Sequence, residues 1–206
     1  MSSIRERARR QILAAAEEEF AAHGFDATRL EAIAERAELP KSNVLYYFQS
    51  KRQLYDSVLD VVIQPLLEAA RLLDANEKPE QSLKAFIQAK FRIAIRHPNA
   101  SSVFVKEMLH GAKRLPETSA EALQQALHMN LECLRSWMER QLIATMAPEQ
   151  LLLFIWSTTQ AYINFGWQAS VLWGQARQID NDQQPAQDTL CRLILNGVDA
   201  ERQPLR

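Results

Sequence analysis

Apolar residues recur at spacings of three and four residues along almost the whole chain, as in the stripe formed by Ile12, Ala15, Ala16 and Phe20. This period belongs to an α-helix with one buried face, whereas a half-buried strand would alternate apolar and polar residues. Glycine, which disfavours helix interiors, occurs only 5 times in 206 residues. The chain is therefore predicted to be all-α.

Capping residues, prolines and glycines divide the sequence into about nine helices. The predicted helices cover residues 4–22, 29–37, 40–48, 51–74, 79–96, 100–112, 117–144, 148–175 and 186–199. Pro65 lies inside the fourth helix and is expected to bend it, because proline removes a backbone hydrogen bond and clashes with the preceding turn.

Two patterns of Ser/Thr-x-x-Glu/Gln are predicted to start helices. They are "TRLE", with Thr28 and Glu31, and "SKRQ", with Ser50 and Gln53. In such a capping box each side chain satisfies the backbone N–H of the other. Gly24 is expected to close the first helix in a left-handed conformation. Each signal is common in helical proteins, but their order here indicates two short helices joined by a tight turn behind a longer one.

That arrangement is a DNA-binding helix-turn-helix. Val44, Leu45 and Phe48 of the third helix are expected to face the core. Polar side chains at the start of a recognition helix reach base edges, and donors at helix ends reach phosphates. The residues predicted to contact double-stranded DNA are Thr28, Lys41, Ser42, Asn43, Tyr46, Tyr47 and Lys51. Packing of the two tyrosines at the edge of the core is the alternative for that pair.

The net charge of −1 does not oppose DNA binding, because the positive charge is local. Four of the first ten residues are arginine. A nearly neutral protein can bind DNA through such a patch, especially as a dimer that reads a palindrome with two recognition helices. Homodimerisation is expected through helices eight and nine, the most apolar helices of the second half.

The helix predicted at 148–175 places Leu152, Trp156, Gln160, Ile163 and Trp167 on one face. A buried amide within such an aromatic stripe needs a hydrogen-bond partner. That partner is either another side chain or a planar heterocyclic ligand, which would also stack on indole.

Three charged residues border the same predicted interior. Lys84 and Lys90 flank the apolar face of helix 79–96, and Glu107 projects between Val103 and Phe104. A buried carboxylate should be paired, so Glu107 is expected either to bind one of these lysines in a structural ion pair or to contact a ligand.

Other functions find less support in the sequence. The histidines are scattered, and neither a catalytic triad, nor metal-ligand spacing, nor a glycine-rich phosphate loop is present. We therefore expect no enzymatic activity, no metal and no cofactor. No apolar run suggests a signal peptide or a membrane span, so a cytoplasmic protein without membrane contact is expected. Cys133 and Cys191 are interpreted as small buried hydrophobic residues.

The run from Arg9 to Tyr55, "RRQILAAAEEEFAAHGFDATRLEAIAERAELPKSNVLYYFQSKRQLY", closely resembles the N-terminal domain of the TetR family of transcriptional regulators. This resemblance implies a DNA-binding domain at residues 1–52 and a ligand-binding and dimerisation domain at 53–206. Glu38 and Asn43 stand where the family commonly has glycine, and no histidine precedes Phe48.

The stretches "HPNASSVFVKEMLHGA" and "LLLFIWSTTQAYINFGWQ" resemble the sensor domain of the pyrimidine-utilisation repressor (RutR) subfamily. The resemblance implies a repressor released by a small planar, pyrimidine-like effector, with ligand contacts from Lys84, Trp156 and Gln160. A tryptophan expected on the fourth helix is replaced by Val62 or Ile63. The full predicted ligand-binding set is Lys84, Lys90, Glu107, Trp156, Gln160, Ile163 and Trp167. The alternatives are a regulator that senses an unrelated ligand, an activator, or a TetR-fold dimer without ligand regulation.

Overall fold

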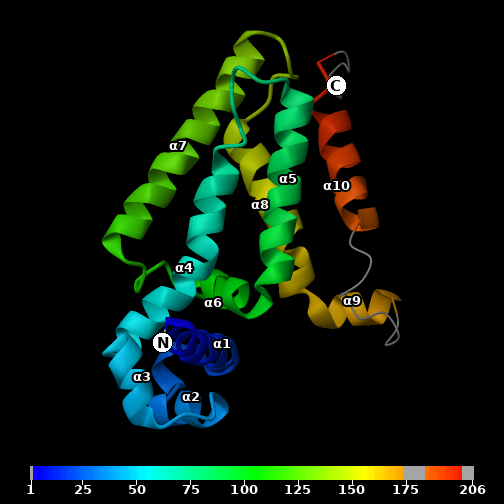
Figure 1. Cartoon of the computed structure of the whole chain (residues 1–206). Helices are drawn as coiled ribbons and strands as arrows, with labels where there is room; N and C mark the ends of the chain where they lie inside the picture. Colours follow the sequence, from blue (N-terminus) through cyan, green and yellow to red (C-terminus); the bar gives the residue numbers. More distant parts are fainter. Residues whose placement is uncertain (1, 174–183, 201–206) are drawn as a thin grey trace. The chain divides into compact units, whose positions relative to one another are not determined.

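The structure, a computed structural model, describes residues 2–173 and 184–200, and helices are the only regular secondary structure in that part of the chain. Figure 1 shows its helices. Their bounds are α1 (Ser2–Ala27), α2 (Leu30–Arg36), α3 (Lys41–Phe48), α4 (Lys51–Ala70), α5 (Pro79–Arg96), α6 (Pro98–Leu109), α7 (Glu117–Glu139), α8 (Pro148–Asn164), α9 (Gly166–Trp173) and α10 (Gln184–Gly197). The all-α prediction is confirmed.

The prediction of one continuous helix over 148–175 is wrong. The chain leaves the helical conformation at Phe165, where φ is −113° and ψ is 37°, and α9 begins at Gly166. Glycine has low helix propensity, which favours a break here over a continuous helix. The split raises the number of described helices to ten. Elsewhere the predicted helices are present, and their ends differ by up to five residues.

Of the two predicted capping boxes, one is formed in half and one is wrong, because the N–H of Ser50 donates to the Phe48 carbonyl and not to the Gln53 side chain. The N–H of Gln53 donates a 3.1 Å hydrogen bond to Ser50 Oγ, which caps α4. Thr28 does not cap α2. That position belongs to Arg29, which makes no side-chain capping bond, and the Thr28 hydroxyl donates to carbonyls of α1 instead. Gly24 has the expected positive φ of 75°, but its ψ of 175° is not that of the left-handed helical conformation that was expected. This combination of φ and ψ is accessible essentially to glycine alone.

The helices form two compact units. Unit 1 comprises Met1–Gln64 and His97–Ala120, and unit 2 comprises Pro65–Arg96 and Glu121–Arg206. Unit 1 is thus larger than the expected DNA-binding domain, because it includes most of α4 and the whole of α6. The boundary within α4 falls directly before Pro65, the only proline inside that helix.

Each unit has its own apolar core. In unit 1 the predicted α1 stripe is buried, and the ring of Phe20 packs edge-on against Tyr55 with centroids 5.0 Å apart. In unit 2, α5 packs against α8 and α10. The predicted apolar face of α5 is buried, as is the indole of Trp137 on α7. Cys133 and Cys191 are free and buried, as expected, and burial is the main cause that raises the pKa of the Cys133 thiol to about 12.

Candidate DNA-binding and effector-binding sites

α2 and α3 are joined by a tight turn. The N–H groups of Ala37 and Leu39 donate to the carbonyls of Ile33 and Ala34 at 2.9 and 3.0 Å. Glu38 between them has a φ of 53°, in the left-handed region that favours glycine. This geometry explains why the TetR pattern commonly has glycine where this chain has Glu38. The turn fixes the direction of α3 relative to α2.

α3 presents a polar face above a buried apolar one. Val44 and Phe48 are buried, as predicted, but Leu45 is exposed, so its expected place in the core is wrong. An eight-residue helix packed along one edge buries only part of its circumference, and Leu45 lies outside that part. The predicted DNA-binding residues of α3 are accessible to different degrees. Lys41, Ser42 and Tyr46 are exposed, and Asn43 and Tyr47 are half-buried.

Two predicted DNA-binding lysines already have partners within the protein. Lys41 Nζ lies 2.6 Å from Glu31 Oε1, an exposed ion pair that joins α3 to α2. Lys51 Nζ donates a 3.2 Å hydrogen bond to the carbonyl of Asp26 and lies 4.6 Å from the ring centroid of Phe25. These contacts orient both side chains at the ends of their helices.

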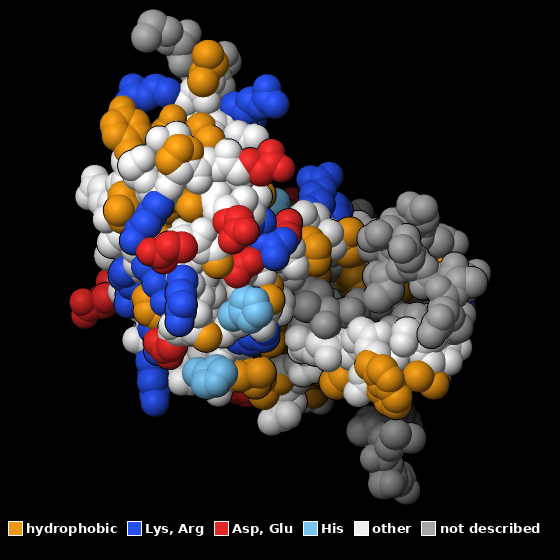
Figure 2. Space-filling view, turned by 90° about the horizontal axis from the view of Figure 1, so that it is seen from below, with side chains coloured by type: hydrophobic (Ala, Val, Ile, Leu, Met, Phe, Trp, Pro, Cys, Tyr) orange, Lys and Arg blue, Asp and Glu red, His pale blue; other side chains and the backbone are white. Residues whose placement is uncertain are grey.

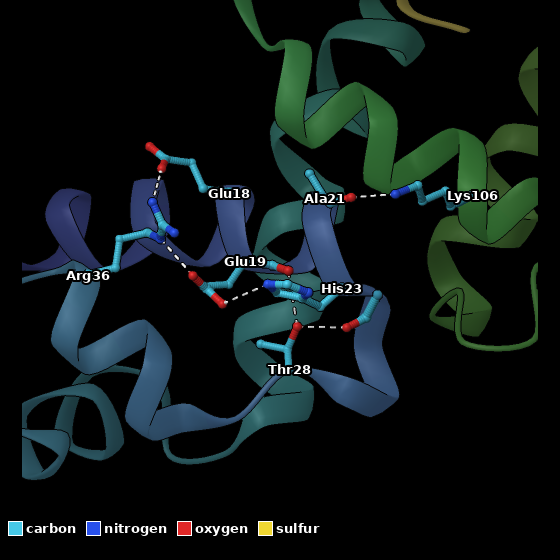
Figure 3. A network of polar contacts seen from close by, with 8 residues as sticks. Glu18, Glu19, Ala21, His23, Thr28, Arg36 and Lys106 are labelled. Atoms are coloured by element: carbon cyan, nitrogen blue, oxygen red, sulfur yellow. Dashed lines mark hydrogen bonds and ion pairs between the residues drawn. The ribbon is translucent and has the colours of Figure 1, made fainter.

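Thr28 lies where α1 ends and is 3% exposed. Its hydroxyl is 2.7 Å from the Gly24 carbonyl and 3.1 Å from the Glu19 carbonyl (Figure 3). The side chain therefore satisfies carbonyls that the end of a helix leaves unpaired. Its structural role in the helix-turn-helix is visible, whereas its predicted contact with phosphate remains a prediction.

An ion-pair cluster fastens α2 to α1. Arg36 lies 2.6 Å from a carboxylate oxygen of Glu18 and 2.7 Å from one of Glu19, and His23 lies 3.8 Å from the other Glu19 oxygen (Figure 3). Lys106 of α6 also donates to the backbone carbonyl of Ala21. Arg36 thus ties α2 to α1, and Lys106 ties α6 to α1. These helices support α3.

The start of α1 lies beside α3. The guanidinium of Arg5 contacts the hydroxyl and ring of Tyr46, and that of Arg9 lies 5.2 Å from the ring centroid of Phe48. Figure 2 views the side of unit 1 that carries α2 and α3, where basic side chains alternate with acidic ones. Arg5 and Arg9 thus lie beside α3, although neither was in the predicted DNA-binding set, and the cluster of N-terminal arginines was the only signal for them in the sequence.

Glu107 is buried in unit 1 and has partners other than a lysine. One carboxylate oxygen accepts a 2.8 Å hydrogen bond from Tyr55, and the other accepts a 2.6 Å bond from the backbone N–H of Arg114. The expectation of pairing with Lys84 or Lys90 is therefore wrong. Helical projection located the burial of Glu107, but the phenol comes from 52 residues earlier in the chain.

Lys90 and Trp156 come together in unit 2. The Lys90 ammonium lies 5.5 Å from the Trp156 ring centroid and 5.7 Å from that of Phe86. Lys90 is buried, and this burial lowers its pKa to about 8. Gln160, one helical turn beyond Trp156 on α8, is half-buried like Trp156. α5 and α8 thus bring two of the residues predicted to bind a ligand into contact, Lys90 and Trp156, and Gln160 follows one turn later on α8.

The other predicted ligand contacts do not join this group. Lys84 is exposed on α5, and Trp167 is 75% exposed on α9. The face predicted to run continuously from Leu152 to Trp167 is interrupted, because the helix breaks at Phe165 between α8 and α9. The side chain of Ile163 lies outside the described residues, and Glu107 belongs to unit 1.

Two buried polar atoms on α7 were not anticipated. Asn130 Oδ1 and Trp137 Nε1 have no hydrogen-bond partner among the described residues. An unpaired buried polar group costs about 1–3 kcal/mol, so both atoms are candidates to bind water or a ligand. Asn130 could have been found as the one amide on an otherwise apolar helix face.

Neither a metal site nor a membrane span is found. Across residues 2–173 and 184–200, no group of three His, Cys, Asp or Glu side chains could hold a metal ion. The same residues include no helix long and apolar enough to cross a bilayer.

Residues 12–58 match the family described as bacterial regulatory proteins, tetR family, and residues 59–201 match the YcdC-like protein C-terminal region. The chain is 30% identical over 190 residues to the HTH-type transcriptional regulator RutR of Escherichia coli (strain K12), which covers 92% of this chain and 90% of RutR. It is 33% identical over 106 residues to the HTH-type transcriptional repressor NicS of Pseudomonas putida, over 51% of this chain and 50% of NicS.

Solved structures share the fold. The ketosteroid transcriptional regulator KstR2 of Mycobacterium tuberculosis superposes with a TM-score of 0.74 at 21% identity, over 93% of this chain and 94% of KstR2. The TetR family regulator PfmR of Thermus thermophilus gives a TM-score of 0.69 at 18% identity, over 91% and 98% of the two chains. Taken with the matches over both halves of the sequence, these findings show that the chain belongs to the TetR family of DNA-binding transcriptional regulators.

Proposed function

We propose that this regulator is a repressor that binds a palindromic operator through residues 1–52 and is released when a small planar, pyrimidine-like effector binds within residues 53–206. The observation that carries the DNA-binding part is the exposed polar face of α3, held on a scaffold braced by Arg36 and Thr28. The effector part is supported by the similarity to RutR over most of the chain and by the grouping of Lys90, Trp156 and Gln160.

The proposed DNA contacts divide by chemistry. Lys41, Ser42 and Asn43 at the start of α3 carry donors suited to base edges, whereas Thr28, Tyr46, Tyr47 and Lys51 suit phosphates. Selection of binding sequences from a random DNA pool, followed by fluorescence anisotropy, would test this assignment. Lys41→Ala should weaken binding to the selected operator, and Lys113→Ala should not, because Lys113 is an exposed lysine outside the helix-turn-helix. Equal affinities of both variants would contradict the assignment.

The effector proposal is tested on the same operator complex. Uracil, thymine and purine breakdown products are added, and release is followed by the loss of anisotropy. Release by a pyrimidine, reduced by Trp156→Ala, is the expected result. Unchanged affinity with every compound would contradict the pyrimidine proposal and favour a regulator with another ligand or with none. Stimulated transcription from a reporter carrying the operator would indicate an activator.

Homodimerisation is proposed through α8, the first part of predicted helix eight, and α10, which corresponds to predicted helix nine. Leu153 and Phe154 on α8 and Leu193 on α10 are exposed apolar side chains, which suit a helical interface between subunits. Light scattering after size exclusion should give twice the chain mass. Phe154→Glu should shift the protein toward monomer, whereas Leu109→Glu on α6 should not, although Leu109 is also exposed. As a DNA-binding transcriptional regulator, the protein is expected to act in the cytoplasm.

A further inference from the structure

Among the residues that the structure describes, Lys90 is a buried cation without an anionic partner. Lys90 is 8% exposed. Its ammonium group makes cation–π contacts with the rings of Phe86 and Trp156. Within residues 2–173 and 184–200, no carboxylate forms an ion pair with it. Glu107, the carboxylate expected nearby, is already hydrogen-bonded to Tyr55 and Arg114 in unit 1.

This arrangement is unfavourable for the protein alone. Removing an ammonium group from water is costly unless an acceptor replaces the water, and two aromatic faces replace it only in part. A methionine would fill a similar volume without that cost. With a pKa of about 8, Lys90 remains mostly protonated at neutral pH. The site therefore offers a positive charge that an anion from outside the chain could neutralise.

The surroundings restrict what kind of anion fits. Trp156 is only half-buried and offers an indole surface next to the ammonium group. Gln160 lies one turn further along α8 and carries an amide with both a donor and an acceptor. A planar ring with polar edges could contact the indole and the amide together, while an acidic substituent reaches Lys90.

We propose that the effector of this regulator is an acidic planar molecule, whose anionic group pairs with Lys90 while its ring packs on Trp156, and that Lys90 selects acids over neutral rings. This inference rests on the proposed function, namely that α5 and α8 form the effector site. It goes beyond that function by specifying the charge of the ligand and the residue, Lys90, that recognises this charge.

The chain contains a matched control. Arg92 is also on α5, but it lies two residues later, which places it on the opposite side of the helix, and it is exposed. Arg92→Met removes one positive charge from the same helix as Lys90→Met without altering the buried group. Lys90→Arg keeps the charge and alters the shape.

The experiment measures binding to the full-length protein by calorimetry with two matched pairs of probes. The pairs are uracil and its 6-carboxylate, orotate, and benzamide and benzoate. We expect at least one acid to bind about tenfold or more tightly than its neutral counterpart, as a charge-assisted hydrogen bond implies. Lys90→Met should remove this preference, Lys90→Arg should keep part of it, and Arg92→Met should leave it unchanged. Circular dichroism verifies that each variant is folded.

The outcomes separate this inference from the proposed function. Binding of an acid that depends on Lys90 but does not release the operator supports the inference and contradicts the proposed regulation. Operator release by uracil with equal affinity in wild type and Lys90→Met supports the proposed regulation and overturns the inference. An acid preference that survives in Lys90→Met, or no binding of either acid at millimolar concentration, also overturns it.

Discussion

The phenol of Tyr55 on α4 donates a 2.8 Å hydrogen bond to the buried carboxylate of Glu107 on α6. Burial, and then this hydrogen bond, raise the pKa of Tyr55 well above its ordinary value, so the phenol keeps its proton. The other Glu107 oxygen accepts from the backbone N–H of Arg114. The Arg114 side chain in turn lies 2.7 Å from Asp26, directly after Phe25 at the end of α1. The Glu107 carboxylate thereby links α6 to α4 directly and, through Arg114, to the end of α1.

Removal of the Tyr55 hydroxyl should destabilise this junction. Tyr55→Phe keeps the ring contacts with Phe20 and Phe25 but leaves a buried carboxylate oxygen without its donor, at a cost of about 1–3 kcal/mol in the free energy of unfolding. Urea denaturation measures this cost. Tyr46→Phe is the control, because its hydroxyl is exposed, and surface changes are usually worth less than about 0.5 kcal/mol. Equal stability of the two variants would show that the Glu107 contact contributes nothing.

Glu31 should restrain DNA binding. Its carboxylate pairs with Lys41, and the hydrogen bond to Lys41 is the main cause that lowers the Glu31 pKa, so Glu31 is charged at neutral pH. An acceptor on DNA, whether a base edge or a phosphate, has to compete with Glu31 for the lysine. Glu31→Gln is therefore expected to tighten operator binding by roughly two- to fivefold, a change typical of an exposed charge pair.

Salt dependence shows whether Lys41 faces phosphate or bases. If it neutralises one phosphate, Lys41→Ala should reduce the slope of log affinity against log salt by about 0.9. If it reads a base, affinity should fall mainly for the cognate sequence. Unchanged affinity in Glu31→Gln together with Lys41→Ala would place the pair outside the interface.

Thr28 should stabilise the protein through its hydroxyl. Thr28→Val keeps the shape of the side chain but removes the donor to the Gly24 and Glu19 carbonyls, with an expected loss of about 1–2 kcal/mol in the free energy of unfolding. Thr28→Ser should retain most of the stability. Thermal and urea unfolding would measure both, with Thr145→Val at an exposed site as a matched control. A stable Thr28→Val protein that binds its operator weakly would instead indicate that the hydroxyl contacts DNA.

Lys90 should make stability depend on pH. Its pKa is about 8 in the folded state, against an ordinary value of 10.5, so the unfolded chain binds the proton more tightly. The folded state is therefore disfavoured below pH 8 by roughly 3 kcal/mol, and this penalty disappears as pH rises from about 8 to 10.5.

Lys90→Met should consequently be more stable than wild type at pH 7, with a difference that shrinks toward pH 10. Urea unfolding at pH 7, 8.5 and 10 measures it, and Lys84→Met, which changes an exposed lysine, should show no comparable trend. A stability difference that stays constant with pH would mean that Lys90 titrates normally in the folded protein.

The sequence by itself determined the helical fold, the order of the helices and the position of the helix-turn-helix. These depend on local signals: the spacing of apolar residues, prolines and glycines at helix ends, and the "LYYF" motif of α3. Ser50 illustrates this, because its cap involves an N–H only three residues away. The TetR family assignment followed from the same local pattern.

Only the tertiary structure decided the partners of the buried polar groups. Thr28 has the pattern of a cap for α2, yet carbonyls of α1 compete successfully for its hydroxyl. Glu107 was expected near lysines, but its donor comes from α4. Lys84 and Lys90 lie on one helix and differ in burial because α8 packs against α5 along one side. Helical periodicity predicts that a side chain faces inward, but the group it meets there depends on contacts between helices far apart in the sequence, which local patterns do not encode.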